Sequence, residues 1–553
     1  MKGIDDYPSR LVSMTMLPLA LFLWTVSIFE SIRKLQNPLN LGDLGLIEIL
    51  SPLYFAAIGI ITLSFFLVVT TQKRSQKTLF LHVLLLVLFL FSTPTLVEGY
   101  RARNSYSAYG FVDYIVTNGQ IDPEKVWYHN WPAFNILYAI LVEVTSISPE
   151  FLIRAFPTLP QILYFLPVYM FARNITKDVK KTWISVWAFY LITWVGQDFL
   201  SPQSLAIFVY GLMLYLLYNQ ILEGNVRLKG RSKQLVSIAF FIVLTTGHFL
   251  TSLAVFFILF LFYIFKYRRI SNTVTFFSLI LTSWTIYGAA SYFESNLLGF
   301  VDEAFRFDLV LKANVVARIS GSSGHALVSE VRMVSTALMI LFAISGFLIS
   351  FKTKRNYSMN KKVAVGLGAL AIFALFFPYG GELFMRIYLF GAIMVICLIS
   401  MNMDSKKTSV FLLLFLMLVP PLHVISHYGN EKHDFIPLSE MCGSNFFYEK
   451  TFNCSVLGGA PWGSFIGAYD KYQTVQLGST NLSKYEEDIL RPSFKTDQPL
   501  FLIITWGDRA FFSMFYNSTD FWSNLEAKMA DRPSHNKIYS APWFELYGIY
   551  HED

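Results

Sequence analysis

The sequence predicts an all-α polytopic membrane protein with about 13 transmembrane helices and a small C-terminal domain of α/β or mostly β structure. Of the 553 residues, 54% are hydrophobic and 15% are charged, whereas a soluble protein carries about 25% charged residues. Apolar runs of about 20 residues recur along most of the chain, and lipid favours helices because a helix satisfies its own backbone groups. After Ser426 the composition becomes mixed and polar, which indicates a separate domain.

The first apolar run has no small-residue cleavage site behind it, so we expect a retained helix. Further along, the polar turn Thr245-Thr246-Gly247-His248 interrupts an apolar stretch. It predicts two short helices that meet near the outer half of the membrane. The expected membrane helices cover roughly residues 10–29, 50–70, 79–97, 151–171, 182–200, 202–221, 235–246, 249–265, 274–293, 331–350, 361–378, 384–402 and 408–426.

Clusters of basic residues between the apolar runs predict the orientation, because the positive-inside rule places them in the cytoplasm. This placement requires residues 133–147 to lie along the outer surface as a juxtamembrane helix. The N-terminus is then cytoplasmic, and the outside receives 98–150, 294–330 and everything after about 427. The basic clusters are Lys73-Arg74-Lys77, Arg173 with Lys177-Lys180-Lys181, Arg227-Lys229-Arg231-Lys233, Lys266-Arg268-Arg269, Lys352-Lys354-Arg355-Lys361-Lys362 and Lys406-Lys407.

The predicted outer domain, residues 427–553, contains one apolar run, Pro499–Trp506, that is typical of a buried strand. Cys442 and Cys454 both lie in this domain, and an outside location permits disulfides. We therefore predict a disulfide between them. Cys397 lies within a membrane helix, where we expect it to act as a small apolar residue.

Residues 94–132 form a polar, aromatic and charge-bearing stretch between membrane helices. Glu98 follows directly after an apolar helix, Arg101 and Arg103 come next, and the stretch ends in Tyr128-His129-Asn130-Trp131-Pro132. Connections between helices are usually short, and long ordered loops tend to be functional. We therefore place the functional site at this loop.

Other ionisable groups reach the same outer mouth under this topology: Asp198 at a tight turn, His248 at the polar turn, and Glu382 with Arg386. The last two are four residues apart, so they share a helix face and can pair. Charges at this depth are costly and usually functional. Each also has a structural explanation: Glu98 as a solvated helix end, Asp198 as a helix cap, His248 as a core histidine, and Glu382–Arg386 as a structural pair. The residues alone indicate an outward-facing polar cavity.

No spacing in the sequence indicates a metal site, a phosphate-binding glycine loop or a Ser/His/Asp signature. The net charge of +7 does not indicate nucleic acid, because membrane topology explains the basic clusters. We therefore expect no cofactor, with a divalent metal allowed but not indicated, and no nucleic-acid partner.

These features resemble the GT-C superfamily of polyprenyl-phosphate-dependent glycosyltransferases, which includes protein mannosyltransferase-like and oligosaccharyltransferase-like enzymes. Residues 109–119 look like the first surface helix of that family's large outer loop, and 128–132 look like the entry to the second. Residues 194–203 are similar to an outer-loop pattern of prokaryotic members, and Gly247-His248 with Thr251-Ser252 resembles their broken-helix turn. The resemblance covers the predicted core, 79–426, with 1–78 as an added transmembrane hairpin and 427–553 as an extracytoplasmic domain.

The resemblance implies transfer of a sugar, with inversion, from a polyprenyl (dolichyl) phosphate donor to an extracytoplasmic glycan, lipid or protein acceptor, among membrane lipids. A carboxylate would accept the acceptor's proton, and cations would stabilise the departing phosphate. Relatives often carry the acid at the position of Asn104, which cannot act as a base, so the role moves to Glu98 with Asp113 and Asp198 as rivals. The family's roles then fall on Arg101, Arg103, Arg318, Arg332, Arg386 and His248 for the donor phosphate, and on Tyr128, His129, Gln203 and Glu382 for the acceptor or sugar.

Two other functions stay open at this point. A transporter or lipid flippase could use the same cavity without changing its substrate, and the broken helix at 235–265 suits it. Against it, the sequence has no duplicated half and its outer loops are large. A sensor or scaffold with a ligand-binding outer domain is the third. The Trp-Trp-Asp motif of oligosaccharyltransferases is absent, which argues against en bloc transfer to asparagine.

The predicted topology gives opposite accessibility to two lysine positions. In a chain without its native cysteines, a cysteine at Lys177 should be shielded from an impermeant thiol reagent applied outside, and one at Lys495 should react. Labelling of intact cells measures both. The reverse pattern would place Glu98 and Asp198 in the cytosol and contradict the proposed outer site.

Overall fold

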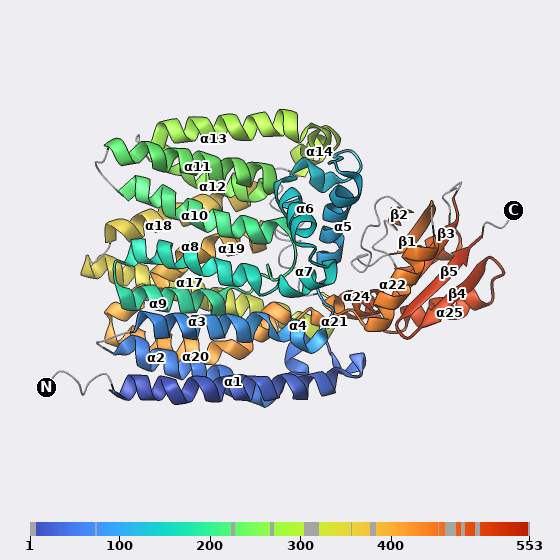
Figure 1. Cartoon of the computed structure of the whole chain (residues 1–553), viewed down its shortest axis with the longest axis horizontal. Helices are drawn as coiled ribbons and strands as arrows, with labels where there is room; N and C mark the ends of the chain where they lie inside the picture. Colours follow the sequence, from blue (N-terminus) through green and yellow to red (C-terminus); the bar gives the residue numbers. More distant parts are fainter. Residues whose placement is uncertain are drawn as a thin grey trace.

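The computed structural model describes residues 7–71, 75–222, 227–265, 270–303, 320–354, 357–376, 383–451, 453–458, 472–476, 482–492 and 498–550. Figure 1 shows long helices packed side by side in one bundle, with a smaller sheet-containing domain at one end. The helical membrane bundle with a small mixed C-terminal domain is confirmed.

Every expected membrane segment overlaps a helix, but the expected span 182–200 is too long, because α9 ends at Ile192 and a loop follows. The bundle helices are α1 (Tyr7–Leu35), α2 (Pro52–Thr70), α3 (Gln76–Phe91), α8 (Leu159–Thr176), α9 (Val179–Ile192), α10 (Pro202–Leu222), α11 (Arg227–Gly247), α12 (Phe249–Ile264), α13 (Ser271–Ser283), α17 (Ser323–Thr353), α18 (Tyr357–Phe376), α19 (Leu383–Ser400) and α20 (Lys406–Tyr428).

Not all of these helices can cross a bilayer alone. Within the described residues, 6 helices are long and apolar enough: those of α1, α2, α10, α17, α19 and α20. Two further candidates are bent pairs, α7 (Pro149–Ala155) with α8 at 43°, and Ser271–Gly288 with Ala290–Asn296 at 78°. The helices α3, α12 and the apolar part of α11 are shorter than the roughly 20 residues that a span needs.

Short elements gather at the end of the bundle that faces the C-terminal domain. There α5 (Arg103–Asn118) and α6 (Ala133–Thr145) run across the direction of the long helices (Figure 1). The α6 helix exposes an apolar stripe that includes Val144, which is 78% exposed. The surface helix expected at 133–147 is therefore present as a short amphipathic helix. Other short elements are η1 (Pro38–Asn40), η2 (Gly45–Glu48), α4 (Thr93–Glu98), η3 (Trp127–Asn130), the π-helical η5 (Trp284–Gly288), α14 (Ala290–Glu303) and α21 (Glu431–Asp434). The short helix η8 (Met401–Asp404) lies at the opposite end, where Asp404 pairs with Lys181 of α9.

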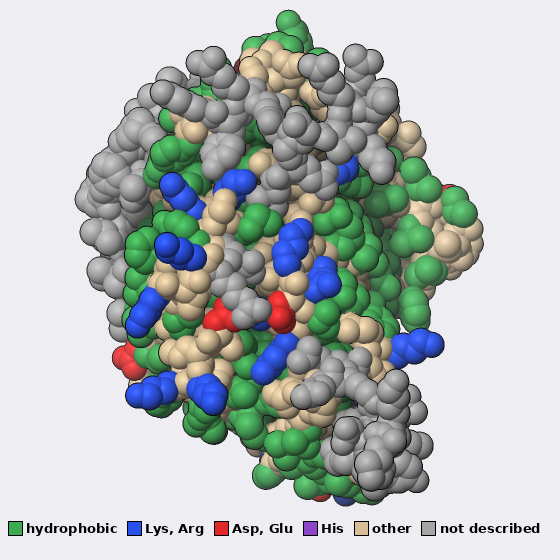
Figure 2. Space-filling model, turned by 90° about the vertical axis from the view of Figure 1, so that its left-hand side faces the viewer, with side chains coloured by type: hydrophobic (Ala, Val, Ile, Leu, Met, Phe, Trp, Pro, Cys, Tyr) green, Lys and Arg blue, Asp and Glu red, His purple; other side chains and the backbone are tan. Residues whose placement is uncertain are grey.

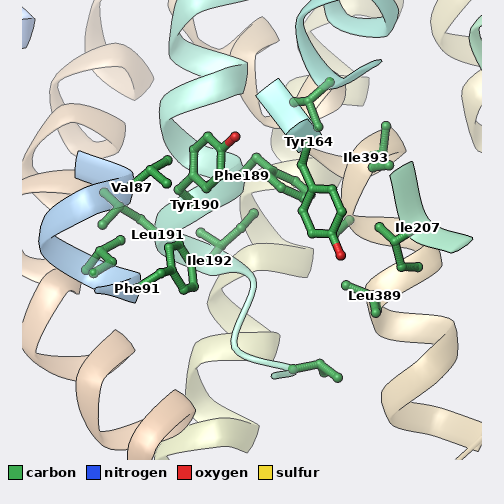
Figure 3. Close-up of a cluster of buried hydrophobic side chains, with 14 of the residues drawn as sticks. Val87, Phe91, Tyr164, Phe189, Tyr190, Leu191, Ile192, Ile207, Leu389 and Ile393 are labelled. Atoms are coloured by element: carbon green, nitrogen blue, oxygen red, sulfur yellow. The ribbon is translucent and has the colours of Figure 1, made fainter. Parts of the chain in front are cut away.

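The α9 helix lies inside the bundle, and every residue from Lys181 to Ile192 is buried. A helix that is apolar all round is buried on all sides. Figure 3 shows side chains of α3, α8, α10 and α19 packed around the end of α9. In the middle of α9, the Trp187 ring stacks on Phe65 of α2 with centroids 4.1 Å apart. The position of α9 fixes the loop that follows it, residues 193–201.

The predicted polar turn separates α11 from α12 at His248, as expected. His248 caps α12, because its Nδ1 accepts a hydrogen bond from the Thr251 backbone N–H at 3.3 Å. Gly247 allows α6 to approach, since a Cβ there would lie 2.5 Å from the Phe134 ring. The turn therefore has a clear structural role.

The C-terminal domain is an α/β domain. Its sheet has the order β2-β1-β3-β5-β4, parallel among β2, β1 and β3 and antiparallel among β3, β5 and β4. The predicted buried strand is β3. The strands are β1 (Cys454–Gly458), β2 (Tyr472–Gln476), β3 (Leu500–Thr505), β4 (His535–Ala541) and β5 (Phe544–Ile549), and the helices are α22 (Leu438–Lys450), α23 (Leu482–Leu490), α24 (Trp506–Tyr516) and α25 (Phe521–Ala530).

The predicted disulfide between Cys442 and Cys454 is wrong for this structure, because both residues are free thiols. Cys454 is buried on β1, while Cys442 is exposed on α22. The α22 helix presents its Gly443 side to β5, where a Cβ would lie 2.2 Å from the Phe544 ring. This packing leaves the Cys442 side chain on the solvent side.

The C-terminal domain docks on the bundle through α21 and α24. Trp506 is 2% exposed and belongs to the same buried cluster as the bundle core. Its Nε1 donates to the Lys432 carbonyl at 2.7 Å, and Lys432 Nζ lies 2.7 Å from Asp43 Oδ1. The Ser322 N–H donates to the Met514 carbonyl at 2.8 Å. The domain therefore contacts the connection between α1 and α2 and the start of α17.

The crossing of α17 and α19 depends on Gly346, where a Cβ would lie 1.9 Å from the Leu398 carbonyl oxygen. We expect Gly346→Ala to lower the free energy of unfolding by about 1–3 kcal/mol, the usual cost of overpacking. Gly368→Ala on α18 is the matched control, because no atom lies within 4 Å of its Cβ position and Ala favours helix. Thermal unfolding measures both, and equal effects would contradict the close crossing.

Candidate functional site

Five segments converge on one buried guanidinium, that of Arg101. They are the end of α4, the turn at 99–103, the loop at 193–201, the end of α20, and α21. Arg101 Nε and Nη2 donate to the two carboxylate oxygens of Glu431 at 2.6 and 3.1 Å. Its Nη1 donates to Asp198 Oδ2 at 3.2 Å, and Glu98 Oε2 lies 3.8 Å from Nε. His427 completes the group with Nε2 3.1 Å from Asp198 Oδ1.

We call Glu98, Arg101, Asp198, His427 and Glu431 the ionic cluster. Each of their side chains is at most 6% exposed. Water is therefore largely excluded, and buried charges are stable only when paired. The cluster contains three carboxyl groups against one guanidinium and one imidazole.

The backbone of the turn brings Arg101 and Arg103 into the interior. Gly99 has φ 77° and Ala102 has φ 58°, so two residues of five adopt left-handed conformations. Such a conformation costs a non-glycine residue about 1–2 kcal/mol, and strained residues concentrate at functional sites. The turn pairs with the chain before α22, where the Ile436 N–H donates to the Tyr100 carbonyl at 3.1 Å.

Arg103 is 1% exposed and joins the turn to the C-terminal domain. It forms a two-pronged ion pair with Glu440 of α22, in which Nη2 lies 2.9 Å from Oε2. Its Nε donates to the His433 carbonyl at 2.7 Å, and Nη2 donates to the Phe435 carbonyl at 2.8 Å. These bonds engage four of the five N–H groups of the guanidinium, so the structure gives Arg103 a structural role that joins the turn to α22.

The carboxyl groups of Glu98 and Glu431 lie in the same buried environment but differ in how readily they are protonated. Burial raises the pKa of Glu98 well above its ordinary value and the Glu431 charge raises it further, while the Arg101 charge opposes both. Burial also raises the pKa of Glu431, but the hydrogen bonds from Arg101 favour its ionised form. Both Glu98 oxygens are buried and have no hydrogen-bond partner within 3.5 Å, although the Glu431 carboxyl is close enough to interact with the Glu98 carboxyl. Glu98 is therefore the more readily protonated of the two carboxyl groups, because Arg101 pairs with Glu431.

The pKa of Asp198 is shifted in the opposite direction from that of Glu98. Burial alone would raise its pKa, but the charges of His427 and Arg101 outweigh burial and hold the pKa of Asp198 below its ordinary value. Both of its carboxylate oxygens are engaged. Asp198 is therefore an ionised but weakly basic carboxylate.

The remaining expected residues in the outer loop are Asp113, Tyr128 and His129, and they differ in burial and in the contacts of their side chains. Asp113 is half-buried on α5, and Tyr128 is half-buried with its ring 4.8 Å from that of Phe111. His129 is 1% exposed and engages both ring nitrogens: Nδ1 accepts from the Asp122 N–H at 3.0 Å and Nε2 donates to the Phe111 carbonyl at 2.9 Å. Because the ring holds the loop together, the acceptor role expected for His129 is not supported.

The other expected residues lie on α17, α19 and α10 or outside the described residues. The guanidinium of Arg332 lies 5.4 Å from the Trp194 ring, and its Nε donates to the Ser426 carbonyl at 2.7 Å. Arg386 is half-buried on α19 and interacts electrostatically with His248. Gln203 is buried at the start of α10, with Nε2 lacking a hydrogen-bond partner. Glu382 and Arg318 lie outside the described residues.

Sequence reasoning missed Glu431, His427 and Glu440. One signal was available: Glu431 follows the last apolar helix closely, as Glu98 follows an earlier one. The pairing itself joins positions 330 residues apart and could not be inferred from spacing. Among the described residues no group of three or more His, Cys, Asp or Glu side chains could hold a metal ion.

Comparison with family models and with curated proteins gives no sequence match. Solved structures do match. ArnT from Cupriavidus metallidurans aligns with TM-scores of 0.53 in the apo state and 0.50 bound to undecaprenyl phosphate, at 10% and 11% identity, covering 85% of this chain and 97% of ArnT. The Archaeoglobus fulgidus oligosaccharyltransferase aligns at 0.48 in the apo form and 0.46 with a tethered acceptor peptide, at 14% and 12% identity, covering 87% and 86% of this chain and 75% and 74% of the enzyme.

Both proteins are GT-C membrane glycosyltransferases. The chain has the GT-C fold. Within this GT-C bundle the ionic cluster lies at the end that carries α5, α6 and the C-terminal domain (Figure 1).

The two glutamates of the ionic cluster should respond differently to neutralisation. Glu431→Gln removes the main partner of a buried guanidinium, so we expect it to lower the free energy of unfolding by about 3–5 kcal/mol. Glu98→Gln replaces an acid whose pKa is raised by burial with an amide of similar shape, and it should cost much less. Chemical denaturation of the purified proteins measures both.

The pH dependence of stability gives a second readout. Because the folded-state pKa of Glu98 is raised, its contribution is fully present below the ordinary glutamate value of 4.5 and is lost as pH rises through the raised pKa. Glu98→Gln should lack this part of the slope. An unchanged slope would show that Glu98 is ionised in the folded protein.

Proposed function

We propose that this chain is an integral membrane glycosyltransferase that moves a sugar from a polyprenyl-phosphate donor to an extracytoplasmic acceptor, with inversion of the anomeric carbon. The observation that carries the proposal is Glu98, a buried acid with two unpartnered oxygens beside Arg101 at one end of a GT-C bundle. The structure of ArnT bound to undecaprenyl phosphate supports a polyprenyl-phosphate ligand for the fold.

Glu98 is a better general base than Asp198. A general base works best when its pKa lies near the operating pH, and burial is the usual way to raise a glutamate pKa towards neutrality. Glu98 has that environment, whereas the pKa of Asp198 is lowered and both of its oxygens are engaged. Buried polar atoms without partners require an explanation, and an acceptor hydroxyl would supply the missing hydrogen bond to Glu98.

The donor phosphate has different cations available from those that the outer loop first suggested. Arg101 and Arg103 are committed to Glu431 and Glu440. Arg332 and Arg386 remain as the proposed phosphate contacts: the Arg332 guanidinium lies 5.4 Å from the Trp194 ring, and Arg386 on α19 interacts electrostatically with His248. In an inverting reaction the acceptor oxygen attacks opposite the phosphate, so base and cations belong on opposite sides of the sugar.

Incubation of the purified protein with radiolabelled polyprenyl-phosphate sugars and envelope acceptors tests the function. We expect Glu98→Gln to lower turnover by about 10²–10⁴-fold, the usual contribution of general-base assistance, while donor binding changes little. Wild-type activity should rise as pH increases through the raised pKa of Glu98, since only the ionised acid accepts a proton.

Asp113→Asn is the matched control, because Asp113 is an acid of the same loop outside the ionic cluster. Wild-type turnover in Glu98→Gln together with loss of turnover in Asp113→Asn would move the base to Asp113. Donor binding without any transfer by the wild-type protein would contradict the enzyme and favour a transporter or flippase.

A further inference from the structure

A second polar cavity lies at the opposite end of the bundle from the ionic cluster. The α9 helix begins beside this cavity and ends at the loop that carries Asp198, and its 14 residues span about 20 Å. The cavity has a volume of about 410 Å³ and lies between α8 and α10. Its lining residues are Tyr169, Met170, Arg173, Asn174, Lys177, Tyr215 and Asn219.

The lining combines cations with buried amide groups. Arg173 and Lys177 are exposed, while Asn174 and Asn219 are only 8% and 6% exposed. Lys177 Nζ donates to Asn174 Oδ1 at 2.9 Å, and Asn174 Nδ2 is buried without a hydrogen-bond partner. A buried amide N–H that lacks an acceptor needs one, and an anion would provide it.

An apolar stripe on α8 leads along the helix to this cavity. Leu159, Ile162 and Leu166 are 49%, 38% and 49% exposed. They lie at helical spacings of three and four, and the same face continues through Tyr169 or Met170 to Arg173. In a membrane protein, exposed apolar side chains next to a basic helix end contact lipid tails and headgroups respectively.

We infer that the cavity binds the phosphate group of an anionic membrane lipid, whose acyl chains follow the α8 stripe. Basic pockets between membrane helices are suited to phosphate headgroups. Figure 2 shows many Lys and Arg side chains on the described part of this end of the molecule, with few acidic ones. Asp178, the nearest acid in sequence, is engaged as the cap of α9 through a hydrogen bond from the Lys181 N–H at 3.0 Å.

Compensation of the partial negative charge at the C-terminus of α8 does not by itself account for the cavity and its buried amide. Cations near a helix C-terminus compensate its partial negative charge, which would explain Arg173 and Lys177. That compensation requires neither a cavity of this size nor a buried amide donor facing it. The apolar stripe also favours a lipid over free phosphate as the ligand, because a soluble anion has no acyl chains to contact it.

Native mass spectrometry of the delipidated full-length protein, titrated with phosphatidylglycerol, phosphatidylcholine or inorganic phosphate, tests the site. We expect the wild-type protein to bind phosphatidylglycerol most tightly. Arg173→Gln/Lys177→Gln should weaken phosphatidylglycerol binding roughly 30-fold, because each basic residue near a lipid surface contributes about fivefold. Its binding of phosphatidylcholine should not change.

Lys406→Gln/Lys407→Gln is the matched control, because it removes two exposed charges at the same end of the bundle, beyond α9. It should retain wild-type binding. An equal loss in this control, or no loss in Arg173→Gln/Lys177→Gln, would overturn the site. Inorganic phosphate bound as tightly as phosphatidylglycerol would overturn the lipid as its ligand. If the double variant does not fold, Lys177→Gln alone should lower affinity roughly fivefold.

Discussion

The buried guanidinium of Arg101 is the constraint on which the rest of this end of the molecule depends. A charge that is 6% exposed is stable only with carboxylate partners in good geometry, and the loss of one partner of such a pair typically costs about 3–5 kcal/mol. Its partners come from three separate segments: α4, the loop after α9, and α21. The ion pairs therefore fix where the outer turn, the central helix and the C-terminal domain meet.

The excess of carboxyl groups over cations gives the cluster its chemical character. Arg101 and His427 favour the ionised forms of Asp198 and Glu431, whereas burial and the Glu431 charge raise the pKa of Glu98. Titratable groups whose environments push their pKa values apart are the usual sign of an acid and base pair. The same asymmetry makes Glu98 more basic than a solvated glutamate and leaves its oxygens available for a further partner.

The sequence was sufficient to predict those features that depend on neighbouring residues alone. Apolar runs and the Thr245–His248 turn predicted the helices and their interruption, because burial in lipid acts on each segment separately. Glu98, Arg101 and Asp198 were correctly grouped, since each follows or precedes a helix at the same end. Glu431 and Glu440 were not, because their pairing crosses 330 and 337 residues. The cysteine pair failed for the related reason that closeness in sequence does not determine which face of α22 is buried.

The same ion pairs make the C-terminal domain part of the site. Glu431 and Glu440 precede the sheet, and α24 of that domain holds α21 through the bond from Trp506 to Lys432. Without the domain, Arg101 and Arg103 would be left as buried charges lacking their closest carboxylates, and the strained turn at Gly99 and Ala102 would lose the backbone pairing that holds it. A domain that looks like an appendage in the sequence therefore determines the protonation of Glu98, through one carboxylate on a helix of four residues.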